Sequence, residues 1–424
     1  MNLFYVKVGQ KSWHPAFLRD ACTCPLCVDP SSKQKNFQTT DIPKEIEAKS
    51  VKEKSNGDVT ITWTKDVPGF KSSHVTTIPA TFFATYNSRA SLEKARYLSP
   101  AFTWTKQKIT ERLQFIDFHE YMHDEARLRH ALRFLTAFGI LLVRGVPDNE
   151  NAVEDLTSRI GTLRDTFYGR TWDVKSIPDA KNVAYTQQHL GLHMDLLYMQ
   201  NPPGLQFLHC LKNTAPGGNS LFSDALSAAH SLPDPIFETL SSQNIAFEYR
   251  NDGQHYYLER PVLEVGNRQQ RTVDFYRTKY YRPEVLNINW SPPFQATLPF
   301  PTKIQGHPLP NVLRALRHFA KKVQHPAAIY EYRLNEGECI IFNNRRILHG
   351  RTAFDATQGE RWLKGAYVDN DVFQSRHRVL CEQAENEVDF DNIDSYTYHV
   401  HPEEARMAQE KQQAYTLKME ESDD

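Results

Sequence analysis

Short apolar runs separated by turn residues occupy the first part of the chain. The runs at residues 3–8 and 58–63 are bounded by turn signals such as the Asn56-Gly57 pair. They predict a small β-rich domain over residues 1–95. The lysine-rich stretch at residues 43–57 shows no apolar period, so we expect a surface loop there.

A polar segment around residues 87–108 separates this part from a second one, which we expect to extend over residues 116–385. Apolar residues at helical spacing predict a helix that ends at Gly139. One long helix is expected later, around residues 313–323. Short strands are predicted at residues 140–146, 204–211, 327–334, 338–344 and 361–368. Many short strands with few helices indicate a β-sandwich or a jelly-roll barrel.

Composition and charge narrow the range of partners. A chain of 424 residues is too long for one ordinary core, and its 50 basic and 51 acidic side chains create no field that would attract nucleic acid or a membrane. No apolar run approaches the roughly 20 residues that span a bilayer, and the start lacks a signal-peptide pattern. We therefore expect a soluble cytoplasmic protein with a small-molecule partner. The polar residues 386–424 are expected to form an exposed helix with an acidic tip.

A candidate iron site consists of His193, Asp195 and His349. Non-haem Fe(II) oxygenases bind the metal with two histidines and one carboxylate, which leaves the other positions open. His193 and Asp195 are two residues apart, so both side chains would point the same way from a strand. This spacing alone is weak, because it also occurs at residues 123–125 and 401–403. His349 strengthens it, since a predicted strand ends there and Gly350 follows.

Arg361 begins the predicted strand that follows His349 by twelve residues. A guanidinium in a buried strand needs an anionic partner, because an unpaired buried charge is costly. The partner is either the carboxylate of a cosubstrate or an internal Asp or Glu.

Three of the six cysteines, Cys22, Cys24 and Cys27, lie within six residues. Thiolates at this spacing in a reducing compartment suit a tetrahedral zinc ion. A fourth ligand is required, and proximity in sequence favours His14. Four protein ligands would make the zinc structural.

Several segments together resemble the γ-butyrobetaine and trimethyllysine dioxygenases, which catalyse steps of carnitine biosynthesis. They are NVAYT, HMDLLYMQNPPGLQFLHCLKNTAPGGNS, NNRRILHGR and RWLKGAYVDNDVFQSRHRVL. The resemblance covers about residues 5–385. It implies a mainly β architecture, with a double-stranded β-helix (jelly-roll) catalytic domain preceded by a zinc-binding domain.

The resemblance also implies the site. His193, Asp195 and His349 would bind Fe(II), while Arg361 and Ser220 would bind the C5 carboxylate of the cosubstrate 2-oxoglutarate. Ascorbate would serve as the reductant. The fourth zinc ligand would be His74 instead of His14. Together with the polar C-terminal segment, the resemblance suggests a homodimer.

The implied substrate carries a quaternary ammonium group, which aromatic faces recognise because it has no N–H to donate. The residues implied for its recognition are Tyr168, Trp172, Tyr185 and Tyr367 around the cation and Asn182 at the carboxylate end. The chain departs from the pattern at Leu196, where a tyrosine is expected, and at Ser291, where an asparagine is expected. γ-Butyrobetaine is the first candidate, followed by trimethyllysine and by another small amine acid.

Two other classes of function share some of these features. A non-catalytic module that binds methylated lysine would use the aromatic residues, and a metal-dependent hydrolase would use two histidines and an aspartate. Neither would need Arg361. Turnover of 2-oxoglutarate separates both from an oxygenase.

Overall fold

The computed structural model describes residues 5–97, 101–175, 187–273, 279–299 and 301–384. The chain divides into two compact units, Met1–Leu98 and Ser99–Asp424. The helix expected over residues 386–424 lies outside the described residues.

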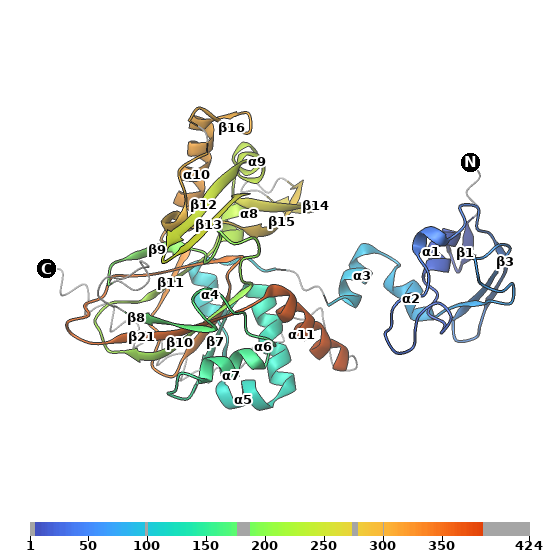
Figure 1. Cartoon of the computed structure of the whole chain (residues 1–424), viewed down its shortest axis with the longest axis horizontal. Coiled ribbons are helices and arrows are strands. Elements are labelled where there is room, and N and C mark those ends of the chain that lie inside the picture. The colour runs from blue at the N-terminus through green and yellow to red at the C-terminus, as the bar shows by residue number, and fades with distance from the viewer. Residues whose placement is uncertain (1–4, 98–100, 176–186, 274–278, 300, 385–424) are drawn as a thin grey trace. The chain divides into compact units, whose positions relative to one another are not determined.

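The N-terminal unit contains two small antiparallel sheets and short helices (Figure 1). Its elements are β1 (Val6–Val8), β2 (Lys11–Trp13), α1 (Pro15–Asp20), β3 (Ala48–Glu53), β4 (Val59–Trp63), β5 (Thr76–Ile78), α2 (Ala80–Thr85) and α3 (Arg89–Ala95). β1 pairs with β2, and the second sheet has the order β3-β4-β5. Alternate residues of β4 and β5 are buried and form the core with Leu18 and Ile46.

The prediction of a surface loop over residues 43–57 is wrong in part, because β3 lies within this stretch. β3 is an edge strand whose side chains are almost all exposed, so its sequence carries no apolar period. Its pairing with β4, instead of burial, holds it in place. Lysines on an exposed edge also discourage pairing with other chains.

Two facing sheets form the centre of the second unit. The larger has the order β6-β7-β19-β10-β21-β8 and the smaller has the order β18-β11-β20-β9. The larger consists of β6 (Phe115–Asp117), β7 (Ile140–Arg144), β8 (Thr171–Lys175), β10 (Leu205–Asn213), β19 (Cys339–Asn343) and β21 (Arg361–Val368). The smaller consists of β9 (Leu190–His193), β11 (Ser220–Asp224), β18 (Ile329–Tyr332) and β20 (Ile347–Arg351). The mainly β, jelly-roll prediction is confirmed.

Helices cover the outer face of the larger sheet (Figure 1). They are α5 (Phe118–His123), α6 (Glu125–Phe138), α7 (Ala152–Ser158) and α11 (Asn370–Gln383). α4 (Lys106–Arg112) packs instead against β18 of the smaller sheet. Gly139 caps the end of α6, as the sequence predicts. Its backbone is left-handed (φ 76°), and its N–H donates to Leu135 O. α11, which packs on α6, was not predicted, and the expectation of a single long later helix is therefore wrong.

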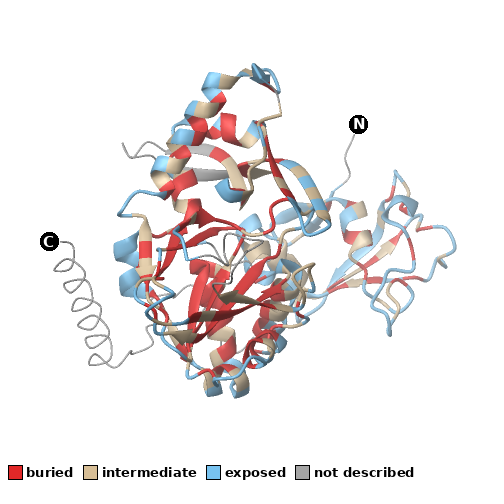
Figure 2. Ribbon diagram, turned by 60° about the vertical axis from the view of Figure 1, so that its left-hand side comes forward, coloured by how far each residue is buried: buried red, intermediate tan, exposed pale blue. Residues whose placement is uncertain are grey.

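Residues 225–328 form an insertion between β11 and β18. It contains α8 (Ala225–His230), α9 (Asp234–Ser242), β12 (Asn244–Asn251), β13 (Gln254–Pro261), β14 (Leu263–Val273), β15 (Lys279–Ile288), β16 (Lys303–Ile304), β17 (His307–Pro308) and α10 (Leu309–Val323). A second apolar cluster joins α8–α10 and the hairpins to the smaller sheet. The buried residues follow the strands of both central sheets (Figure 2). The second unit thus has two apolar clusters, and each contains residues of both central sheets.

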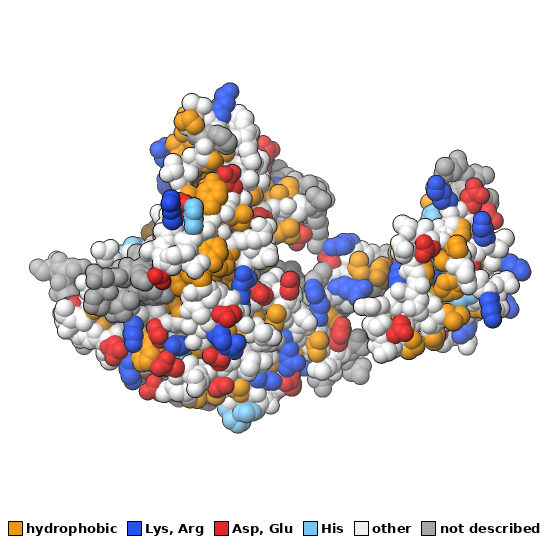
Figure 3. Space-filling model, in the orientation of Figure 1, with side chains coloured by type: hydrophobic (Ala, Val, Ile, Leu, Met, Phe, Trp, Pro, Cys, Tyr) orange, Lys and Arg blue, Asp and Glu red, His pale blue; other side chains and the backbone are white. Residues whose placement is uncertain are grey.

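Basic and acidic side chains are intermixed on the visible surface of each unit (Figure 3). Neither sign of charge predominates on that face. As a separate finding, no helix among the described residues is long and apolar enough to cross a membrane.

A buried ion pair between Arg346 and Asp224 lies where several segments of the second unit meet. Arg346 donates to both carboxylate oxygens of Asp224, at 3.0 and 2.8 Å, and also to Ala137 O and Phe102 O. The side chain of Asp224 is fully buried. Replacing Arg346 would leave that carboxylate uncompensated.

We expect Arg346→Met to lower the free energy of unfolding by about 3–5 kcal/mol, because a buried charge loses its partner. Urea denaturation of the purified variant measures this change. The control is Arg376→Met, which removes a pair with the half-exposed Glu125 and should cost about 1 kcal/mol or less. Equal losses of unfolding free energy in the two variants would contradict a special contribution of the Arg346–Asp224 pair to stability.

Candidate active site

His193 and His349 lie opposite each other on neighbouring antiparallel strands. The register pairs His349 of β20 with His193 of β9, and the ring centroids are 4.2 Å apart. Asp195 follows β9, with one carboxylate oxygen 3.3 Å from His193 Nε2 and the other 3.7 Å from His349 Nε2. One candidate ligand atom from each residue lies within 4.8 Å of the others. The structure thus brings the three predicted residues to one point.

Two details of the prediction are wrong. β9 ends at His193, so Asp195 reaches the site from beyond the strand instead of by strand alternation. His349 is the middle residue of β20 and does not end a strand.

Neighbouring groups orient the three side chains. Gly191 O lies 2.9 Å from His193 Nδ1, which fixes the proton there and leaves Nε2 as the ligand atom. Tyr367 donates its hydroxyl proton to Asp195 Oδ2 at 2.6 Å. These contacts are the kind that hold metal ligands in place.

The electrostatics of the site favour a cation. Burial raises the pKa of Asp195, but His349 and His193 beside it hold that pKa well below its usual range. Burial and the neighbouring His193 lower the pKa of His349 to about 3, so the imidazole is neutral. A carboxylate and neutral imidazoles are the protonation states that bind a divalent metal. The residues therefore fit the ion that the sequence predicts.

A pocket opens beside the three residues, between the two sheets. It is lined by Trp172, Val174, Leu190, His193, Asp195, Gln206, Leu208, Ser220, Phe222, His349, Gly350, Arg351, Arg361 and Leu363. Arg361 and Ser220 were predicted here, whereas Gln206 and Arg351 were not. Both lie in segments that carry the family resemblance, but only the facing of the two sheets places their side chains in the pocket.

Arg361 is buried and forms no ion pair with a carboxylate of a described residue. Its Nε donates to Gly218 O at 2.9 Å, and an added Cβ at Gly218 would lie 2.7 Å from Arg361 Cδ. Burial and the nearby Arg351 lower the pKa of Arg361 to about 9, which still leaves it charged near neutral pH. The internal Asp or Glu that the sequence allowed is not found among the described residues. An anionic ligand remains the partner that this charge requires.

Aromatic rings lie near Asp195, and one of them, Trp172, lines the pocket. Trp172 and Tyr367 stack with centroids 4.0 Å apart, and an added Cβ at Gly365 would meet Trp172 at 2.4 Å. Tyr168 lies farther out, with its hydroxyl 3.4 Å from that of Tyr198. Asn182 and Tyr185 lie outside the described residues.

Tyr198 was not predicted, although it comes three residues after Asp195. It is buried in a cluster of rings that connects the site to the insertion. The rings in contact with Tyr198 are Phe167, Tyr249, Tyr256 and Phe294.

In the N-terminal unit the thiols of Cys22, Cys24 and Cys27 lie 3.7, 3.4 and 3.4 Å from His74 Nε2. All four ligand atoms are within 4.8 Å of one another. His14 is elsewhere, where its Nδ1 caps the start of α1. The structure thus brings together the His74 set and not the His14 set.

A second layer surrounds this cluster. Asp66 Oδ2 lies 2.7 Å from His74 Nδ1, and Arg19 binds Asp66 Oδ1 and approaches Cys27 Sγ at 3.4 Å. A carboxylate behind a histidine is typical of zinc sites, because it fixes the tautomer that ligates.

Comparison with known proteins gives two family matches. The model described as taurine catabolism dioxygenase TauD, TfdA family matches residues 98–367, and the model described as gamma-butyrobetaine hydroxylase-like, N-terminal matches residues 3–74. Dioxygenase str8 of Strobilurus tenacellus is 38% identical, covering 89% of this chain and 87% of its own. Gamma-butyrobetaine dioxygenase of Pseudomonas sp. (strain AK-1) is 29% identical, covering 87% and 90%. Mitochondrial trimethyllysine dioxygenase of Bos taurus is 26% identical, covering 87% and 82%.

We expect Cys24→Ser to lower the melting temperature of the N-terminal unit and to reduce bound zinc, because metal binding in a small domain contributes folding energy. Calorimetry and elemental analysis of the full-length protein measure both. Cys210→Ser changes a buried thiol outside the cluster and should keep the zinc. Wild-type protein that contains no zinc after expression would refute the site.

Proposed function

The chain belongs to the TauD, TfdA family of dioxygenases, and from that premise we propose that it hydroxylates γ-butyrobetaine with Fe(II) and 2-oxoglutarate. One observation carries the proposal. The three clustered ligands share a pocket with Arg361, a buried cation that has no carboxylate partner among the described residues. A metal-binding hydrolase or a reader of methylated lysine would not require this arrangement.

We assign iron to His193, Asp195 and His349, because the ionised Asp195 and the neutral His349 suit a divalent metal. When bound, Fe(II) would use dioxygen to convert 2-oxoglutarate to succinate and CO2 and to place one oxygen atom in a substrate C–H bond. Three protein ligands leave positions for the cosubstrate and dioxygen. The role of the chain is to hold these groups in place.

Arg361 and Ser220 are assigned to the distal carboxylate of 2-oxoglutarate. The guanidinium offers a planar pair of donors that matches a carboxylate, and its Nε is already used by Gly218 O. That bond fixes the direction in which the remaining donors point. Ser220 starts β11 and pairs with Arg351 of β20, which places its buried side chain in the same pocket.

Trp172 and Tyr367 are assigned to the trimethylammonium group. Because the Tyr367 hydroxyl is already bound to Asp195 and its ring stacks on Trp172, Tyr367 would contribute through its ring and not through a hydrogen bond. Tyr168 would extend this surface, and we keep Tyr185 for the cation and Asn182 for the carboxylate as part of the proposal. Ascorbate as reductant and a homodimeric state also belong to it.

Trimethyllysine is the second candidate substrate, because relatives with that name match as much of the chain as those named for γ-butyrobetaine. It is longer and carries an additional α-amino group. Side-by-side turnover of the two compounds by the wild-type protein decides between them.

We expect Asp195→Ala to abolish Fe(II)-dependent succinate formation while the fold is retained, because the metal loses one of three ligands. Mass spectrometry of succinate and circular dichroism measure the two properties. Asp173→Ala is the control, since Asp173 bonds Trp362 and Lys364 on the same sheet outside the pocket. Undiminished turnover in the Asp195 variant would remove this residue from the site.

We expect Trp172→Leu to raise KM for γ-butyrobetaine about 2- to 30-fold, since one cation–π contact is worth about 0.5–2 kcal/mol. KM for 2-oxoglutarate should change little. Trp362→Leu is the matched control, because Trp362 lies on β21 but does not line the pocket.

The neutral isostere, with carbon in place of nitrogen, tests the charge itself. It should bind the wild-type protein weakly and lose little further in the Trp172 variant. If the isostere and γ-butyrobetaine bind equally well to wild-type protein, the rings serve packing alone.

A further inference from the structure

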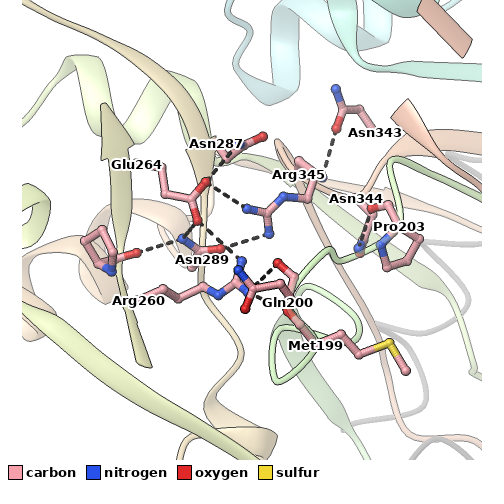
Figure 4. Close-up of polar contacts among 11 residues, drawn as sticks. Met199, Gln200, Pro203, Arg260, Glu264, Asn287, Asn289, Asn343, Asn344 and Arg345 are labelled. Carbon is pink, nitrogen blue, oxygen red and sulfur yellow. Dashed lines mark hydrogen bonds and ion pairs between the residues drawn. The ribbon is translucent and has the colours of Figure 1, made fainter. Parts of the chain in front are cut away.

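The loop that follows Asp195, residues 195–203, is held at both ends by one buried asparagine. Asn344 accepts from Asp195 N at 2.8 Å and donates to Asp195 O at 3.1 Å and to Pro203 O at 3.3 Å. The side chain lies in the turn between β19 and β20 and is fully buried (Figure 4). It therefore fixes the backbone of the aspartate assigned to iron.

The outer part of the 195–203 loop is held from the insertion. Arg260, near the end of β13, donates through Nη2 to Met199 O and to Gln200 O. The side chain is buried, and its partners are backbone carbonyls that no change of side chain in the loop would remove.

A chain of charged and amide groups joins these two attachments (Figure 4). Arg260 Nη1 lies 3.4 Å from Glu264 Oε1, and Glu264 Oε2 lies 3.3 Å from Arg345 Nη2. Asn289 accepts from Arg345 at 2.8 Å and donates to Glu264 at 3.0 Å. Because Arg345 is next to Asn344 in sequence, the insertion is connected to the turn that holds Asp195.

The 195–203 loop contributes more than Asp195 to the site. Leu196 has a left-handed backbone with φ of 60°, which a leucine adopts only when its surroundings enforce it. The hydroxyl of Tyr198 lies near that of Tyr168, and its ring packs on Tyr249 and Phe294 of the insertion. A shift of the outer part of the loop would move the Tyr198 ring, while Asn344 holds the backbone of Asp195.

We propose that Arg260, Glu264 and Arg345 are positioning residues, through which the insertion sets the pose of the 195–203 loop and thereby the affinity for the substrate. The consequence for substrate affinity rests on the proposed function. Stability alone does not account for the arrangement, because buried ion pairs often contribute little net stability compared with apolar residues.

The test compares Arg260→Met with Arg282→Met. Arg282 is equally buried in the same insertion, but it binds Asp234 and Leu232 O instead of the loop. Arg260→Met should speed hydrogen–deuterium exchange of amides in residues 195–203 about tenfold or more, because charge-assisted bonds to the loop are lost. Arg282→Met should leave exchange in this loop at the wild-type rate.

Kinetics provide the second measurement. In Arg260→Met, KM for γ-butyrobetaine should rise about tenfold while KM for 2-oxoglutarate stays within about twofold of wild type. Arg260→Lys, which keeps the charge and one donor toward the carbonyls, should recover part of the loss. Equal exchange and equal KM in Arg260→Met and Arg282→Met would overturn the inference.

A third variant covers the case in which Arg260→Met does not fold. Glu264→Gln keeps the shape of the link and removes its charge, and it should raise loop exchange in the same segment. Unchanged exchange in that variant would also count against the inference. If wild-type protein does not turn over γ-butyrobetaine, the proposed function fails, and exchange in residues 195–203 still decides whether the three residues position the loop.

Discussion

The register between β9 and β20 is the constraint on which the site depends. It places His193 opposite His349 on one face, and a slip of one residue would turn one imidazole away. Gly350 enforces this register, because an added Cβ there would lie 2.6 Å from Leu190 O of the neighbouring strand. The close approach of the two backbones and the pairing of the two histidines are therefore consequences of the same alignment.

Three consecutive residues of the turn between β19 and β20 bind three other parts of the second unit. Asn344 holds the backbone of Asp195, Arg345 reaches the insertion and Arg346 pairs with Asp224. Each arginine of the turn finds a carboxylate, whereas Arg361 in the pocket finds none among the described residues. Identical side chains thus have different roles, which are set by the presence or absence of an internal partner.

The sequence predicted those strands and helix ends whose pattern is set by residues close together in the chain. β10, β19 and β21 follow from apolar runs, and the end of α6 follows from Gly139. β3 was missed because an exposed edge strand has no buried face to produce a pattern. Gln206, Arg351 and Tyr198 were missed for another reason. Their place in the site arises from strand facing and loop path, which a local pattern does not encode.

The central sheets and the insertion hold different residues of the candidate site. His193 and His349 lie on strands whose pairing tolerates little change, and Arg361 begins a strand of the facing sheet. Tyr198, next to Tyr168, instead lies on a loop that is attached to the insertion through Arg260. Under the proposed positioning role, changes in the insertion would move Tyr198 while the two histidines and Arg361 stay fixed. Asp195 lies at the junction, because its side chain serves the metal site and its backbone belongs to the loop. Asn344 keeps these two roles compatible, since it fixes the aspartate to the β19–β20 turn whatever pose the outer loop adopts.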